Sequence, residues 1–242
     1  MLITNERTPF YFLASISLFF TIILSLLDVF YNNKNFSDFY PNPGNYYGKP
    51  IHDKNFIDKL IYYFSQFTHH TLFLLFFYFF SCLLNYKSEK YFKIIAPISL
   101  TISVLYFYFL YPKQNINIHN LSYSSFYSHF MIIFLIFGEL FYIDGFTLSE
   151  TSNCLVFLIV GVLVTIINYM VRGVWTYNIV KLDSLKGWVL INQTILIMYG
   201  FSFMFYFFKP KNDIKYISYY KSAPFFSTLI NILFTLVYLI YT

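Results

Sequence analysis

The residues of this chain that could do chemistry lie within long apolar stretches. Thr68 is followed directly by His69 and His70, and His129 lies in a second apolar stretch. A threonine hydroxyl becomes a nucleophile when a base removes its proton, and histidine is the usual base near neutral pH. Thr68 and His129 are therefore candidates for a nucleophile and its base. The alternative is structural, because a helical threonine often bonds its own backbone and a histidine can simply join two helices.

The histidines also raise the question of a metal. His69 and His70 are adjacent, so in a helix they point about 100° apart and cannot share one face. One of them, with His129 and a carboxylate, could supply the three converging ligands that a metal needs. The spacing does not require this, and the two cysteines, Cys82 and Cys154, show no metal-knuckle pattern. We expect neither a metal nor a cofactor.

The composition points to a lipid environment. The chain has 242 residues, of which 58% are hydrophobic and 11% are charged, whereas a soluble domain has about 25% charged residues. Aromatic residues make up 25% of the chain, and tyrosine rings suit the interfaces of a membrane. The net charge of +5 is not gathered into a basic block. Membrane lipid is therefore the expected partner, and nucleic acid is not.

The apolar stretches predict an all-α fold, a polytopic transmembrane helix bundle of about six or seven helices. Each stretch has roughly 18–25 residues, which is enough to cross a hydrocarbon core of about 30 Å at about 1.5 Å per residue. We expect a single integral-membrane domain over residues 1–242. The predicted helices lie near residues 10–30, 60–84, 91–111, 123–143, 154–171, 188–208 and 224–241.

This topology places the polar residues at different depths. Helical rise puts Thr68 about 12 Å and His129 about 9 Å into the membrane from the same side. Asn168 and Asn192 fall in the same half, whereas the other half is expected to be drier, with Glu139 as an exception. The pattern predicts a polar cavity open to one side, and ordinary polarity at helix ends is the alternative. Glu139 could pair with a polar group on a neighbouring helix or face a small cavity, and we expect a structural role for it.

Further residues could contact a substrate in such a cavity. Thr71 lies three residues after Thr68 and so shares its helix face. Thr71, Asn168 and Asn192 are candidate substrate-binding residues and donors to a developing oxyanion. Trp175 and Tyr177 follow the predicted helix at 154–171, where anchoring at the membrane interface is favoured over contact with substrate.

Three short motifs between residues 59 and 208 resemble a known family. They comprise Phe67-Thr68 with Thr71, His129 with Glu139 ten residues later, and Gly173, Trp175 and Tyr177 with Gly187 ten residues after the tyrosine. Their order and approximate spacing resemble those of the androgen-induced integral-membrane proteins and their bacterial multi-pass relatives. The chain departs from the family at Thr71, where asparagine is usual, and at Asn178, where proline is common.

The resemblance implies an enzyme of lipid metabolism. Its members are intramembrane hydrolases that cleave lipid esters such as fatty acid esters of hydroxy fatty acids. It implies that Thr68 is the nucleophile, that His129 is the base and that a lipid ester is the substrate. The bacterial relatives imply an integral protein of a bacterial cell membrane. The pattern leaves open a non-enzymatic transporter, channel or assembly protein with a polar intramembrane cavity.

Overall fold

The apolar stretches form helices throughout the part of the chain that can be described. The structure, a computed structural model, describes residues 7–31, 56–110, 123–140, 142–147, 150, 153–172, 175–177 and 181–208. The helices are α1 (Thr8–Tyr31), α3 (Phe56–Ser65), α4 (Phe67–Leu83), α5 (Glu89–Leu105), α6 (Tyr123–Phe126), α7 (Ile132–Leu140), α9 (Cys154–Arg172) and α10 (Leu185–Phe208), with π-helical turns η2 (Tyr106–Leu110) and η5 (Tyr127–Met131). The prediction of a helical bundle is confirmed for these ranges. The predicted helix 224–241 lies outside them.

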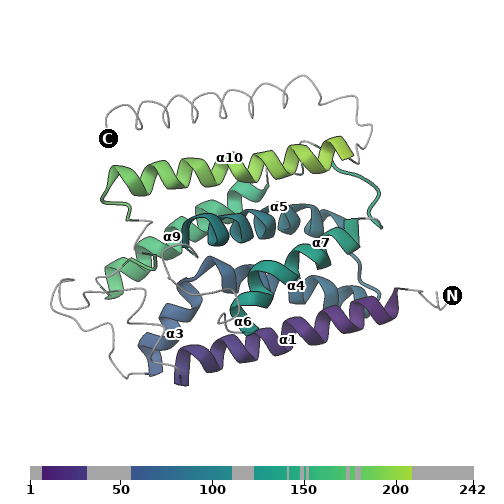
Figure 1. Ribbon diagram of the computed structural model, residues 1–242, viewed down its shortest axis with the longest axis horizontal. Helices are drawn as coiled ribbons and strands as arrows, with labels where there is room; N and C mark the ends of the chain where they lie inside the picture. The colour runs from purple at the N-terminus through teal and green to yellow at the C-terminus, as the bar shows by residue number, and fades with distance from the viewer. Residues whose placement is uncertain are drawn as a thin grey trace.

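Several of these helices match what a membrane requires. Among the described residues, three helical segments are long and apolar enough to cross a membrane, Thr8–Phe30, Glu89–Tyr108 and Leu185–Phe208. Shorter apolar helices cover Phe67–Leu83, Ser124–Leu140 and Cys154–Met170. The helices lie side by side with their long axes roughly aligned, and α1 and α10 form opposite edges of the described bundle (Figure 1).

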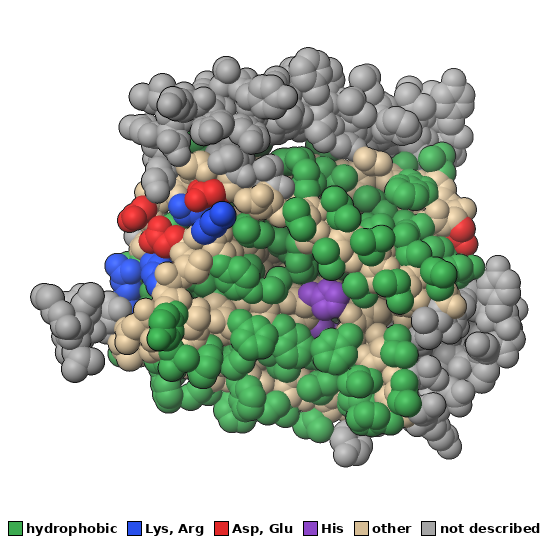
Figure 2. Space-filling view, turned by 180° about the vertical axis from the view of Figure 1, so that it is seen from behind, with side chains coloured by type: hydrophobic (Ala, Val, Ile, Leu, Met, Phe, Trp, Pro, Cys, Tyr) green, Lys and Arg blue, Asp and Glu red, His purple; other side chains and the backbone are tan. Residues whose placement is uncertain are grey.

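The helices pack through a large apolar core. α1 lies along α4, and the core between them and α5 and α7 includes Leu18, Leu72, Phe79 and Ile136. The outer surface is also apolar, and Figure 2 shows hydrophobic side chains over most of one broad face. Exposed apolar side chains of this kind suit contact with lipid tails, since helices in a membrane associate by close packing and hydrogen bonding rather than by expulsion of water.

The predicted helix 60–84 is instead two helices, α3 and α4, separated at Gln66. The backbone of Gln66 is extended, with φ −88° and ψ 125°. Carbonyl groups at the end of α3 therefore lack the N–H groups that would follow one turn later in a continuous helix. Two imidazoles donate hydrogen bonds to them instead. Nδ1 of His69 donates to the Tyr63 carbonyl at 2.8 Å, and Nε2 of His70 donates to the Phe64 carbonyl at 2.5 Å. Irregular backbone within a membrane has to be satisfied in this way.

The predicted helices 91–111 and 123–143 are present, and each contains a π-helical turn. The first continues from α5 into η2, and the second runs from α6 through η5 into α7 and ends at Leu140. His129 belongs to η5 and stacks on Tyr106, the first residue of η2, with ring centroids 3.6 Å apart and an angle of 3° between the rings. Such π turns are frequent at functional sites.

The half that the sequence predicts to be drier contains a charged cluster. Glu139 is fully buried, and its Oε1 lies 3.1 Å from Nζ of Lys87 and accepts a hydrogen bond of 2.7 Å from the Tyr78 hydroxyl. A second pair joins Lys93 to Glu150 at 3.3 Å. Figure 2 shows most of the visible charged side chains gathered at one end of the apolar face. The expectation that Glu139 pairs with polar groups on neighbouring segments agrees with these contacts.

Candidate functional site

A pocket opens between α4, α5, α9 and α10, where η5 meets α5. Its volume is about 90 Å³. Its walls carry threonine hydroxyls, two tyrosines and one histidine among aliphatic and aromatic side chains, and none of the described lining residues is Asp, Glu, Lys or Arg. A pocket without a charged wall suits an uncharged, largely apolar ligand.

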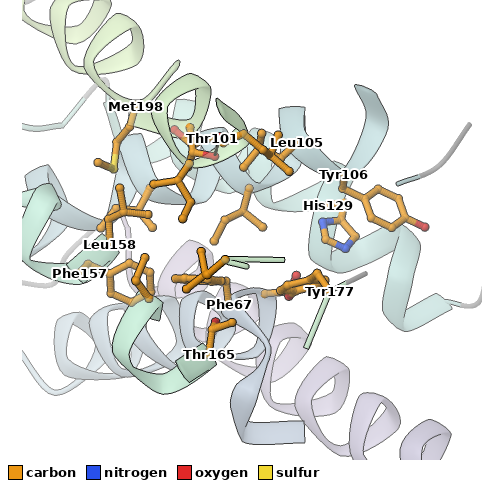
Figure 3. A pocket seen from close by; sticks show the side chains of 18 residues that line it. Phe67, Thr101, Leu105, Tyr106, His129, Phe157, Leu158, Thr165, Tyr177 and Met198 are labelled. Carbon is orange, nitrogen blue, oxygen red and sulfur yellow. Dashed lines mark hydrogen bonds between the residues drawn. The ribbon is translucent and has the colours of Figure 1, made fainter. Parts of the chain in front are cut away.

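The two ends of the pocket differ in chemistry (Figure 3). Tyr106, His129 and Tyr177 lie together at one end, and Leu158 and Met198 lie at the other. The apolar end continues into a buried cluster formed by Ile98, Cys154, Leu158 and Met198. The pocket therefore has a histidine and two tyrosines at one end. At the other end Leu158 and Met198 lie with Thr101, whose hydroxyl donates to the Pro97 carbonyl at 2.7 Å.

Thr68 and His129, predicted to share a site, both line this pocket. Thr68 is the second residue of α4 and is half-buried, so its hydroxyl stands beside the interruption at Gln66. His129 comes from η5, on a different helical segment. The structure thus brings the candidate nucleophile and the candidate base to one cavity.

The imidazole of His129 has an unused polar atom. The residue is 5% exposed, and its Nδ1 has no hydrogen-bond partner among the described residues. Leaving a buried polar group unsatisfied costs about 1–3 kcal/mol. Because the ring is held against Tyr106 and lines the pocket, a partner for this nitrogen would have to come from a ligand or from water within the cavity.

The N-terminus of α4 adds hydrogen-bond donors to the same place. The first N–H groups of a helix have no partner within it, and no described backbone carbonyl accepts from Phe67 N–H or Thr68 N–H. The Tyr177 ring lies 6.5 Å from that of Phe67, at 16°. Burial raises the pKa of Tyr177 to about 12, although the Thr68 hydroxyl and the backbone of Phe67 and Thr68 act as hydrogen-bonding neighbours that lower it. The neutral phenol therefore lies at the end of α4, where its oxygen is the hydrogen-bonding partner of these two N–H groups.

Two predicted binding residues near the pocket have other partners. The Thr71 hydroxyl donates to the Thr68 carbonyl at 2.8 Å, and Thr71 is 1% exposed. Nδ2 of Asn168 donates to Oγ1 of Thr176 at 3.1 Å, which ties α9 to the segment that follows it. Neither Thr71 nor Asn168 is among the described lining residues.

The other two predicted binding residues are also not among the described lining residues. Nδ2 of Asn192 donates to the Trp188 carbonyl within α10 at 3.0 Å. Trp175 is 6% exposed, stacks on Tyr169 at 4.1 Å, and donates from Nε1 to Asp183 at 3.3 Å. The contacts of Trp175 hold the connection between α9 and α10, which carries Tyr177 to the pocket.

The sequence did not single out Tyr106, and for Tyr177, as for Trp175, it favoured anchoring at the membrane interface over contact with substrate. No local pattern marks the π turns that bring Tyr106 against His129. Among the described residues, no three side chains of His, Cys, Asp or Glu are grouped in a way that could hold a metal ion. No protein-family model, curated protein or solved structure matches this chain.

Proposed function

We propose that this protein is a multi-pass membrane hydrolase that cleaves lipid esters, with Thr68 as the nucleophile and His129 as the base. The observation that carries this proposal is the unpartnered Nδ1 of His129, buried in the same pocket that Thr68 lines. The uncharged, largely apolar walls favour a lipid over an ion or a polar solute. The resemblance to the androgen-induced integral-membrane proteins assigns the same two residues.

In the first half of the reaction, the Thr68 oxygen attacks the ester carbonyl carbon while its proton passes to His129. The tetrahedral intermediate collapses when the bond from carbon to the alcohol oxygen breaks. The departing alcohol takes the proton from His129, and the acyl group remains as an ester of Thr68. Histidine suits both transfers because its ordinary pKa lies near neutrality.

In the second half, water attacks the acyl carbon and gives one proton to His129. The bond to the Thr68 oxygen breaks, Thr68 recovers a proton from His129, and the fatty acid leaves.

The test is activity of the purified full-length protein in detergent, with fluorophosphonate labelling as a second measurement. We expect Thr68→Ala to lose labelling and ester hydrolysis, and Thr68→Ser to keep both. His129→Gln should lower hydrolysis by about 10²–10⁴-fold, the usual contribution of general acid–base catalysis. Thr21→Ala is the matched control, because Thr21 is a buried threonine of α1 that bonds the Ser17 carbonyl and is not a described lining residue.

Two results would contradict the proposal. One is hydrolysis by Thr68→Ala at the rate of the unmodified protein. The other is an unmodified protein that neither hydrolyses lipid esters nor reacts with fluorophosphonate, in detergent where a known hydrolase of the resembled family is labelled.

A further inference from the structure

The phenol of Tyr177 meets α4 where that helix begins. Its oxygen has three hydrogen-bonding neighbours, the backbone N–H groups of Phe67 and Thr68 and the hydroxyl of Thr68. A phenol has one proton to donate and an oxygen that accepts. Backbone N–H groups can only donate, so these two use the accepting side of the phenol oxygen. The phenol proton is therefore left to be donated, and the Thr68 hydroxyl oxygen is the acceptor beside it.

The connection between α9 and α10 holds this phenol in place. Thr176, the residue before Tyr177, accepts a hydrogen bond of 3.1 Å from Nδ2 of Asn168 on α9. Trp175 donates from Nε1 to Asp183 at 3.3 Å. A donor that is fixed before the reaction does not have to reorganise when negative charge develops beside it.

The other hydroxyl groups of the pocket wall have other directions. Tyr106 stacks on His129, and Figure 3 shows its hydroxyl directed away from the other labelled side chains. Apart from Thr68, the threonines among the described lining residues donate to carbonyl groups of their own helices at 2.7–3.0 Å; they are Thr101, Thr165 and Thr194. Among the described hydroxyl groups that line the pocket, Tyr177 is thus the one placed to donate beside the nucleophile.

We propose that Tyr177 is a further catalytic residue, whose hydroxyl donates a hydrogen bond to the negative oxygen of each tetrahedral intermediate. This rests on the proposed function, with Thr68 as the nucleophile. After the attack, the Thr68 oxygen and the former carbonyl oxygen are bonded to the same carbon atom, so a donor that reaches one can reach the other. The Thr68 oxygen is now bonded to carbon and accepts weakly, whereas the former carbonyl oxygen is negative and accepts strongly.

No proton is transferred in this step, because the phenol donates a hydrogen bond and stays neutral. Burial raises the pKa of Tyr177 to about 12, so the phenol keeps its proton near neutral pH.

The first test is steady-state hydrolysis of a lipid ester by the full-length protein carrying Tyr177→Phe, which removes the hydroxyl and keeps the ring. We expect kcat to fall by about 10²–10³-fold, the usual effect of removing one oxyanion donor. KM should stay close to that of the unmodified protein, because the lost bond is made in the intermediate and not to the bound ester. Tyr199→Phe is the matched control, since Tyr199 is a buried tyrosine of α10 and is not a described lining residue.

The second test measures the contact between Tyr177 and Thr68 without any turnover. Tyr177 is replaced by 3-fluorotyrosine, and the fluorine signal is followed against pH by nuclear magnetic resonance. The Thr68 hydroxyl is one of the neighbours that lower the pKa of Tyr177, so Thr68→Val should move the titration to higher pH. The same label in place of Tyr199 should not respond to Thr68→Val.

The outcomes separate this proposal from the hydrolase itself. Hydrolysis that depends on Thr68 but keeps its kcat in Tyr177→Phe would overturn the role of Tyr177 and leave the hydrolase standing. A titration that does not respond to Thr68→Val would overturn it as well, since the phenol would then not meet the nucleophile. A titration that responds, in a protein that hydrolyses no ester, would keep the contact and remove both catalytic roles.

Discussion

At the scale of single residues, the buried polar groups of this bundle differ in whether they have partners. Glu139 bonds Lys87 and Tyr78, and the imidazoles of His69 and His70 bond backbone carbonyls. A few described residues retain a buried polar atom without a partner, and of these His129 alone lines the pocket. Partnered groups stabilise the fold, whereas an unpartnered nitrogen beside a cavity is available for chemistry.

The Lys87–Glu139 pair gives a prediction at this scale. Lys87→Met leaves a buried carboxylate without its cation, and removing one partner of a buried pair costs about 3–5 kcal/mol. We expect the lower part of this range, because Lys87 is 24% exposed and water can reach it. Unfolding in detergent, followed by circular dichroism against denaturant, would show the loss as a lower midpoint.

The matched control for this prediction is Lys90→Met, which removes an exposed lysine from the same region and should change the midpoint little. The double variant Lys87→Met with Glu139→Gln should recover part of the loss, since the carboxylate charge is gone. An unchanged midpoint in Lys87→Met would show that the pair does not stabilise the protein.

At the scale of elements, the interruption at Gln66 is the feature that makes the site. A continuous helix over 60–84 would bond Phe67 N–H and Thr68 N–H to carbonyls one turn earlier. The break instead gives α4 a new N-terminus at the pocket, while His69 and His70 satisfy the end of α3. The same local event thus turns these two N–H groups toward the Tyr177 phenol and positions the candidate nucleophile.

Close packing of α9 against α4 gives a second prediction. A Cβ atom at Gly161 would lie 1.6 Å from the Phe67 ring, so Gly161→Ala has to push this ring, which lines the pocket beside Thr68. We expect hydrolysis to fall about 10²-fold, the effect of displacing a catalytic group by about 1 Å. Steady-state kinetics with a lipid ester would measure it.

Gly200→Ala is the control, because a Cβ atom there meets nothing within 4 Å. That variant should keep its activity and gain about 0.5–1 kcal/mol of stability, as alanine favours a helix over glycine. Full activity in Gly161→Ala would mean that the position of Phe67 has no bearing on catalysis.

The sequence predicted the helical stretches well because apolar runs of this length have few alternatives. It also placed Thr68 and His129 at similar depth, from helical rise alone, and both line one pocket. The break at Gln66 was missed because no glycine or proline marks it. The groups that satisfy the broken end of α3 are the side chains of His69 and His70, three and four residues later. Thr71 and Asn192 were chosen by type and spacing, but each bonds the backbone of its own helix, which residue type does not reveal.

At the scale of the whole molecule, the bundle has two chemically distinct ends. Lys87, Glu89, Lys93 and Glu150 meet at the end that contains the turn between α4 and α5. The opposite end carries the connection from α9 to α10, with Trp175 and its partner Asp183. Apolar side chains cover the length between (Figure 2). We propose that the shorter apolar helices cross the membrane together with the three long ones.

This topology can be tested by labelling cysteines in intact cells. Cys82 and Cys154 are buried, at 3% and 0% exposure, so a membrane-impermeant maleimide should give little background. New cysteines are placed at Tyr86, which is 77% exposed between α4 and α5, and at Lys186, which is exposed at the start of α10. Between them lie α5, the segment α6–η5–α7, and α9. Three crossings place the two sites on opposite sides, so one site should react from outside and the other only after the cells are permeabilised. The topology would be contradicted if both sites reacted from outside, or if both reacted only after permeabilisation. Either result would mean that at least one of these three segments does not cross the membrane. The pocket would then not lie at the depth that intramembrane ester hydrolysis requires.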